Sequence, residues 1–240
     1  MRRCWQSWSQ HNPGWDLRIL DARTARLVAP LEAYVDLSRQ QITAASLSDW
    51  LRLLLLARHG GVWADATLLC NRALDDWLPE QLQSGFFAFD KPGPDRPLAS
   101  WFLAAEPAHP LVLRWLSEAE AYWHHRSAAD DYFWLHRRFY DVLAEPALHE
   151  AWSRTPKLSA DGPHQLQRLG LSASTNDLEQ HVDWTVPVFK LIHRLAPGDY
   201  RPGLLAFDVL QPYPPLCVDA LRLDLEALGP IAPSSVLPPP

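Results

Sequence analysis

Residues 48–67, SDWLRLLLLARHGGVWADAT, decide the fold of this chain. The first part of this stretch belongs to a run of helix-forming residues over 44–59. The spacing of its leucines predicts one buried face, formed by Leu47, Leu51, Leu54 and Leu55. Gly60 and Gly61 are expected to end this helix, because glycine adopts the left-handed conformation without strain. The apolar segment 62–69, VWADATLL, then predicts a buried strand that carries an acid.

The flanking sequence predicts further helices and strands. Upstream, residues 4–10 indicate a short helix, and residues 15–20, WDLRIL, alternate apolar and polar side chains as a strand does. Downstream we expect, in order, strands over 85–90 and 99–106 with a loop over 91–97 between them, helices over 110–125 and 129–144, and a strand over 186–195. The sequence therefore predicts an α/β domain over 1–232, followed by a disordered Pro-rich tail over 233–240.

Composition excludes several classes of protein. A formal net charge of −6 argues against a nucleic-acid-binding protein, which would show a basic excess. The three cysteines, Cys4, Cys70 and Cys217, form no C-x-x-C pair, so neither a zinc site nor a disulfide framework is indicated. The run LRLLLLA from Leu51 is too short for a transmembrane segment. We expect a cytoplasmic protein, free or at the inner face of the membrane.

Asp65 is the first candidate for chemistry. A carboxylate has no packing role in an apolar strand, and the small side chains of Ala64 and Ala66 leave room beside it. Mg²⁺ and Mn²⁺ are commonly held by one or two carboxylates while substrate phosphates complete the shell. Such an ion would neutralise the charge on a departing diphosphate. An aspartate that bonds its own turn is the alternative, and spacing alone does not separate the two.

Asp49 and Arg52 form a second candidate group. They lie three residues apart on the predicted helix, share one face and can pair. In a leucine-rich helix these charges should be buried, and a buried charge requires a partner or a ligand. A ligand contact is one interpretation; a surface salt bridge worth about 0–1 kcal/mol is the other.

Residues 48–67 resemble the signature of capsular polysaccharide synthesis proteins, which are relatives of glycosyltransferase family 32. Further blocks of the chain resemble those proteins in the same order, namely SWSQHNPGWDLRIL (7–20), ASWFLAAEPAHPLVLRWL (99–116), DYFWLHRRF (131–139), PHQLQ (163–167) and VPVFKL (186–191). The resemblance covers residues 5–195. Its central motif is specific, and each outer block is weak individually.

The resemblance implies a GT-A-like fold, a Rossmann-type mixed sheet flanked by helices. It implies a retaining glycosyltransferase of the hexosyl type, which moves a sugar from a nucleotide-sugar donor onto a polysaccharide or lipid-linked acceptor. A DXD-type acid would bind Mn²⁺ or Mg²⁺ and, through it, the donor diphosphate. Relatives open with a strand before the first helix, so we expect this fold to lack its first N-terminal strand.

The resemblance also assigns site residues. Asp65 would be the catalytic first acid of the DXD-type motif and a metal ligand together with His164, while Asp130 or Asp131 would face the donor sugar or the incoming hydroxyl. The residues expected to bind the donor are Asp49, Arg52, Gly60, Gly61, Trp63, Thr67, His164 and Lys190. Among these, Asp49 would contact the sugar or ribose and Arg52 would orient it. His164 and Lys190 would hold the diphosphate.

One departure from the pattern opens an alternative. Thr67 stands where the family 32 motif has its second acid. A catalytically impaired, carbohydrate-binding relative of the transferases is therefore the second hypothesis. A phosphohydrolase that uses Asp65 as nucleophile ranks lower, because Thr67 cannot serve as the second acid–base group.

Overall fold

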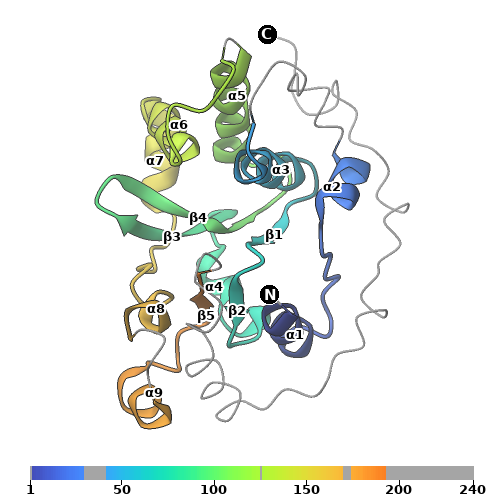
Figure 1. The fold of residues 1–240 in the computed structure, drawn as a ribbon. Coiled ribbons are helices and arrows are strands. Elements are labelled where there is room, and N and C mark those ends of the chain that lie inside the picture. Colours follow the sequence, from blue (N-terminus) through green and yellow to red (C-terminus); the bar gives the residue numbers. More distant parts are fainter. Residues whose placement is uncertain (1, 30–41, 125, 170–173, 193–240) are drawn as a thin grey trace. The chain divides into compact units, whose positions relative to one another are not determined.

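The computed structural model describes residues 2–29, 42–124, 126–169 and 174–192. It is a mixed α/β structure with small sheets (Figure 1). The elements of the described residues are, in chain order, α1 (Arg2–His11), α2 (Ala22–Val28), α3 (Ala44–His59), β1 (Gly61–Ala64), β2 (Leu68–Cys70), η2 (Leu74–Asp76), α4 (Leu78–Gln81), β3 (Phe86–Gly93), β4 (Arg96–Ala105), α5 (Pro110–His124), α6 (Trp134–Leu143), α7 (Pro146–Arg154), α8 (Gln165–Leu169), α9 (Thr175–His181) and β5 (Val188–Lys190).

The chain divides into two compact units. Unit 1 is built from Met1–Ile19, Ala64–Glu80 and the segment that begins at Ser159. Unit 2 is built from Leu20–Trp63 and Gln81–Leu158. The signature stretch therefore contributes to both units, because the chain leaves unit 2 after Trp63.

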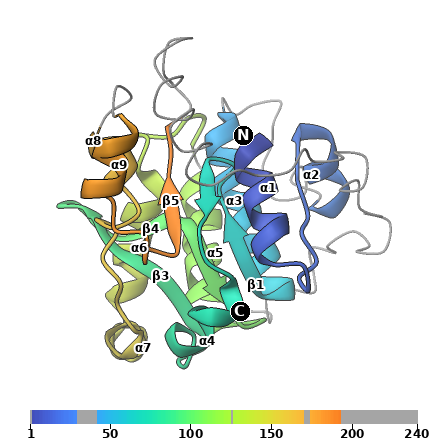
Figure 2. The ribbon, with the colours of Figure 1, turned by 90° about the horizontal axis from the view of Figure 1, so that it is seen from below.

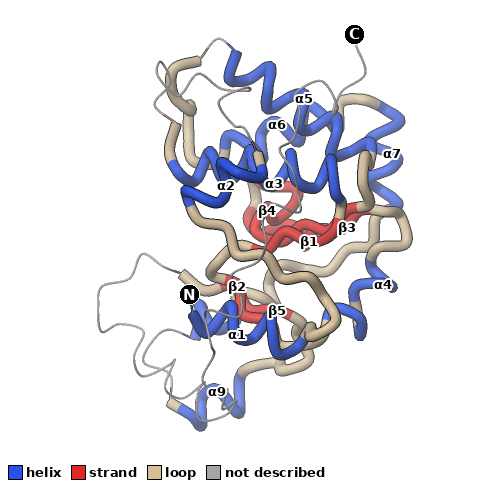
Figure 3. Tube along the Cα trace, turned by 90° about the vertical axis from the view of Figure 1, so that its right-hand side faces the viewer, coloured by secondary structure: helices blue, strands red, loops and turns tan. Residues whose placement is uncertain are grey.

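Unit 2 is a three-stranded sheet covered by helices. Its strand order is β1-β4-β3, and β3 pairs with β4 in an antiparallel hairpin. Helices α3, α5, α6 and α7 lie on one face of this sheet (Figures 1 and 3). The helices bury their apolar sides against the sheet and one another, which is the usual solution for elements that are apolar on one face.

Helix α3 is the centre of the unit 2 core. Trp50, Leu53 and Leu54 are fully buried. Leu47 and Leu55, which the spacing placed on the buried face, are only half-buried. The prediction of one leucine face was thus partly wrong, because α3 packs against both α5 and β4 and buries most of its circumference.

Unit 1 is organised around a two-stranded antiparallel ladder. Leu68 lies opposite Lys190, and Cys70 lies opposite Val188. Helix α1 packs against β2, and α8 contacts both α9 and β5 (Figure 2). Its small apolar cluster contains Leu69 of β2 and Phe189 of β5.

Side chains of α1, and Asn12 just after it, hold β2 and the segment that follows β2. The buried Ser7 Oγ accepts a hydrogen bond from the Cys70 N–H at 2.8 Å and donates to the Cys4 carbonyl at 2.7 Å. Trp8 Nε1 donates to the Leu68 carbonyl at 3.0 Å. Asn12 Oδ1 accepts from the backbone N–H of Leu74 at 2.7 Å. Because these bonds satisfy strand and loop backbone groups, the SWSQHN block has a structural role.

Replacing Ser7 by alanine is expected to lower the free energy of unfolding by about 1–3 kcal/mol, since the buried Cys70 N–H loses this acceptor. Urea unfolding monitored by fluorescence measures the change. Ser9→Ala is the matched control, because Ser9 lies on the same helix, is only half-buried and undergoes the same change in helix propensity. Equal stability losses for the two variants would refute this role of Ser7.

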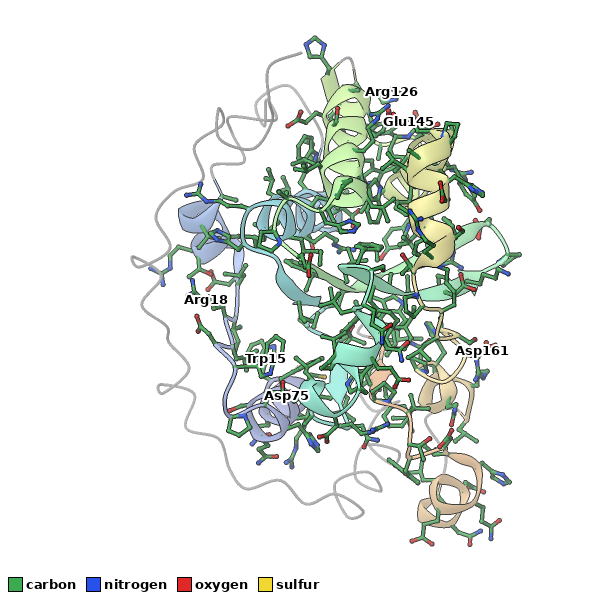
Figure 4. All side chains as sticks on the ribbon, turned by 180° about the vertical axis from the view of Figure 1, so that it is seen from behind. Trp15, Arg18, Asp75, Arg126, Glu145 and Asp161 are labelled. Atoms are coloured by element: carbon green, nitrogen blue, oxygen red, sulfur yellow. The ribbon has the colours of Figure 1, made fainter. Side chains whose placement is uncertain are left out.

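The strand predicted over 15–20 is wrong. Its residues form no strand, because their side chains bond locally or to η2. Trp15 Nε1 donates to Asp75 Oδ1 at 3.0 Å (Figure 4), and Arg18 pairs with Asp16.

Two predicted boundaries also changed. The segment 62–69 is two short strands, β1 and β2, because a turn closed by the bond from Leu68 N–H to the Asp65 carbonyl (2.9 Å) separates them. The loop predicted over 91–97 belongs largely to the β3–β4 hairpin, which tolerates its prolines through register shifts between Ala88 and Gly93. The predicted tail, 233–240, lies outside the described residues.

Candidate functional site

The predicted site residues divide between the two units. Unit 1 contains Asp65, Thr67, His164 and Lys190. The residues in unit 2 are Asp49, Arg52, Gly60, Gly61, Trp63, Asp130 and Asp131.

Asp65 and Thr67 occupy the turn that precedes β2. The prediction that Asp65 lies within a strand was wrong, because its carbonyl accepts the bond that closes this turn. Its side chain retains 27% of its accessible surface. A partly exposed carboxylate in a turn can meet a ligand, which a carboxylate inside a buried ladder could not.

Lys190, the last residue of β5, brings its ammonium to this turn. Lys190 Nζ donates to Thr67 Oγ1 at 2.5 Å and to the Leu191 carbonyl at 3.2 Å. It lies 3.9 Å from Asp65 Oδ2, with 16% of the lysine side chain exposed. The ladder explains the meeting, since Lys190 pairs with Leu68 and the Leu191 N–H donates to the Thr67 carbonyl at 2.9 Å. The structure thus brings three predicted site residues together.

His164 belongs to the segment that flanks β5. Its Nδ1 lies 2.7 Å from the Ala160 carbonyl, so Nδ1 carries the proton and donates. In the neutral ring this leaves Nε2 as the acceptor nitrogen, the form that a metal ligand requires. The neighbouring Pro163 carbonyl accepts from the Lys190 N–H at 2.8 Å, which places the His164 backbone beside β5.

Asp65 is the one acidic side chain of this group, because Thr67 and Lys190 contribute no carboxylate. Among the described residues, no three His, Cys, Asp or Glu side chains gather in a way that could hold a metal ion. The Lys190 ammonium lies beside Asp65, which the resemblance assigned to the metal. One carboxylate next to a fixed positive charge is a poor ligand set for Mg²⁺ or Mn²⁺ without further oxygens from a substrate.

In unit 2, Asp49 and Arg52 form the expected ion pair. Arg52 Nη1 lies 3.1 Å from Asp49 Oδ1, and the two side chains are only 6% and 14% exposed respectively. The same Nη1 donates to the Ser100 carbonyl of β4 at 2.8 Å. The guanidinium carbon also lies 5.3 Å from the ring centroid of Trp63. Arg52 is buried as predicted while Asp49 is only partly buried, and Arg52 ties α3 to β4 through protein groups.

Gly60 and Gly61 end α3 as predicted, but for different reasons. Gly60 has φ 64° and ψ −152°, which is not the left-handed helical conformation that we expected. A Cβ on Gly60 would lie 2.7 Å from the Ala105 carbonyl oxygen and from Pro107, so the close approach is to the protein's own backbone. Gly61 has φ 85° and open space where its Cβ would be.

Asp130 and Asp131 precede α6 rather than lying on it. The helix predicted over 129–144 begins only at Trp134. Asp131 Oδ1 accepts from the Phe133 N–H and Oδ2 from Arg137 Nε, both at 2.6 Å. Asp130 pairs with Arg126, which is labelled in Figure 4. An aspartate fits position 131 because its side chain satisfies the backbone N–H of Phe133 in the turn before the helix.

His136 is a buried histidine for which sequence analysis proposed no role. Its Nδ1 has no hydrogen-bond partner among the described residues. Burial first, then the positive charges of Arg52 and Arg96, lower the pKa of His136 from 6.5 to about 3, against the opposing effect of Asp95 and Asp131. The folded protein therefore holds this imidazole neutral.

This shift predicts loss of stability in acid. Between pH 6.5 and about 3 the His136 imidazole is protonated in the unfolded chain and neutral in the folded protein. The free energy of unfolding therefore falls as the pH is lowered through this window. The slope is at most about 1.4 kcal/mol per pH unit. Urea unfolding of the native protein and of His136→Gln between pH 4 and 7 measures it. The native curve should be the steeper; parallel curves would contradict the assignment.

Comparison with known proteins identifies one family. Residues 1–202 match the family described as "Capsular polysaccharide synthesis protein". The chain belongs to that family. No curated protein and no solved structure matched the chain.

The family match confirms the resemblance inferred from the signature stretch. It extends over both candidate groups, because Asp49 and Lys190 lie within it. The name of this family supports the predicted role in capsular polysaccharide synthesis. No helix among the described residues of this family member has the length and apolar composition needed to cross a membrane.

The family blocks also explain which contacts sequence analysis missed. Ser7, Trp8 and Asn12 fall in the opening block, and their bonds to β2 and to Leu74 are structural. The sequence did contain a sign of this structural role. Polar residues beside tryptophan on a short helix indicate a partly buried face, on which polar groups need hydrogen-bond partners. The backbone groups to which these side chains bond lie about 60 residues further along the chain, which no local pattern reveals.

Proposed function

We propose that this chain is a glycosyltransferase, which moves a sugar from a nucleotide-sugar donor onto a glycan or lipid-linked glycan acceptor in capsular polysaccharide synthesis. Membership of the capsular polysaccharide synthesis family supports the role. The observation that supports the proposed reaction is the position of the Lys190 ammonium beside Asp65 and Thr67. We also propose the GT-A type of fold and retention of anomeric configuration, on the basis of the resemblance.

The proposed reaction breaks the bond between the anomeric carbon and the diphosphate. The electron pair goes to the nucleoside diphosphate, the acceptor hydroxyl forms the new glycosidic bond, and its proton goes to the departing phosphate oxygen. The protein must therefore position two substrates and stabilise a growing negative charge. An ammonium held beside the end of the β2–β5 ladder, on a side chain that is 16% exposed, is suited to that task.

Asp65 has a second part in this proposal. Its carboxylate keeps the ammonium near the turn and can accept a hydrogen bond from a donor hydroxyl. The contacts predicted for Asp49, Arg52 and Trp63 with the sugar or ribose stay predictions, as do those of Asp130 and Asp131 with the reacting groups. The Mn²⁺ or Mg²⁺ ion predicted on Asp65 and His164 also stays a prediction.

A panel of nucleotide-sugars tests the proposal. We expect at least one donor to release nucleoside diphosphate, faster with an oligosaccharide acceptor than with water alone. Asp65→Asn should slow this release, while Asp16→Asn, at an exposed carboxylate paired with Arg18, should not. If calorimetry shows oligosaccharide binding but no nucleotide or nucleotide-sugar binding, the chain is instead a carbohydrate-binding relative of the transferases, for which Thr67 is the motivating residue.

A further inference from the structure

The oxygen atoms near the turn at Asp65 already surround a cation, the ammonium of Lys190. Thr67 Oγ1 and the Leu191 carbonyl accept hydrogen bonds from Lys190 Nζ at 2.5 and 3.2 Å, and Asp65 Oδ2 lies 3.9 Å away. A hydroxyl, a carbonyl and a carboxylate are also the oxygen types that a hard metal ion uses. The lysine ammonium thus occupies surroundings of the kind that a divalent ion would seek.

We propose that Lys190, rather than a divalent metal ion, is the cation that neutralises the diphosphate of the donor in this chain. This inference rests on the proposed transferase function. It makes donor binding independent of metal, and it assigns to Thr67 the task of holding the ammonium.

The charges of the group support this assignment. A motif with two acids carries two negative charges, which a divalent ion balances. Here Thr67 stands in the place of the second acid, so that one carboxylate, that of Asp65, lies beside the Lys190 ammonium. A divalent ion entering this group would be repelled by that ammonium. Thr67, in the place of an acid, and Lys190 therefore act together: the threonine hydroxyl holds the ammonium where a second carboxylate would help to hold a metal ion.

The backbone around Lys190 fixes the ammonium in advance. On one side the residue pairs with Leu68 of β2. On the other side its N–H donates to the Pro163 carbonyl at 2.8 Å, and its own carbonyl accepts from Gln167 Nε2 at 2.8 Å. With the strand held along both edges and the ammonium bonded to Thr67, little side-chain freedom remains to be lost when an anion binds.

Titration calorimetry with UDP, GDP and dTDP, once in EDTA and once in Mn²⁺, tests the inference without any turnover. We expect one of these diphosphates to bind the native full-length chain with dissociation constants that agree within about twofold in the two buffers. Binding that EDTA abolishes and Mn²⁺ restores would overturn the inference while leaving the transferase function standing. Binding of none of the three in either buffer would count against the function itself, and with it the inference.

Thr67→Asp provides the converse test. The second carboxylate should bind the ammonium and recreate an acid pair, so that diphosphate binding in EDTA falls by about tenfold or more and is recovered in Mn²⁺. Thr67→Val is the matched control, because it removes the hydroxyl without adding charge and should stay independent of metal. Thermal unfolding of both variants checks that unit 1 is folded. A folded Thr67→Asp protein that binds the diphosphate as the native chain does would contradict the inference.

Discussion

Replacing Gly60 by valine is expected to lower the free energy of unfolding by about 2–6 kcal/mol. Gly60 has φ 64° and ψ −152°, a conformation that essentially only glycine adopts and that costs other residues about 1–3 kcal/mol. The new Cβ would lie 2.7 Å from three atoms, the Ala105 carbonyl oxygen and the Pro107 N and Cδ. These are backbone and ring atoms that cannot rotate away, so overpacking adds about 1–3 kcal/mol.

Gly61→Val is the matched control for this prediction. Its φ of 85° also strains a valine, but nothing lies within 4 Å of the position of its Cβ. We expect a loss of about 1–3 kcal/mol, from backbone strain alone. Denaturant unfolding of both variants, followed by tryptophan fluorescence, measures the difference. A Gly60→Val protein that is as stable as Gly61→Val would show that the approach of the α3 end to residues 105–107 is not tight.

Replacing Lys190 by methionine is expected to lower kcat/KM for sugar transfer by about a hundredfold or more, without rescue by Mn²⁺. Removal of one group that stabilises developing negative charge typically costs about 10²–10³ in rate. Methionine preserves most of the apolar stem, so the packing of β5 should survive. Lys190→Arg keeps the positive charge and should lose less activity, although its planar fork does not reproduce the bonds to Thr67 and Leu191.

Lys91→Met controls for the loss of a lysine charge. Lys91 is exposed on β3 in unit 2 and has no part in the candidate group. Initial rates with the donor identified in the panel, at several donor concentrations, separate effects on kcat from effects on KM. An unchanged rate for Lys190→Met, or a full rescue by Mn²⁺, would remove Lys190 from the chemistry. A rate loss shared by Lys91→Met would indicate a nonspecific effect of charge.

The signature stretch predicted helix α3 of unit 2, because its information is local. A 16-residue helix followed by two glycines is specified by its own composition, and α3 indeed spans Ala44–His59. The pairing of Asp49 with Arg52 followed from their spacing on this helix, and the structure contains this ion pair. The hairpin was less visible, because prolines at 92 and 97 suggest a loop and are accommodated only through register shifts.

The candidate site was less predictable, because it depends on long-range pairing. Lys190 and Thr67 are 123 positions apart, and only the register of β2 against β5 brings them together. The family resemblance predicted Lys190 and Thr67 separately as site residues, but the sequence did not indicate that the lysine bonds to the threonine. The turn at Asp65 was hidden as well, since VWADATLL contains neither glycine nor proline to mark a break.

Phosphorus NMR of a nucleotide-sugar incubated with the native chain tests the central claim most directly, because it observes the two phosphates of the donor. With an acceptor present, and in EDTA as well as in Mn²⁺, we predict that the donor signals are replaced by those of the intact nucleoside diphosphate. If the donor signals persist for the whole panel under both conditions, or if they give way to nucleoside monophosphate and sugar phosphate, the chain is not the transferase proposed here.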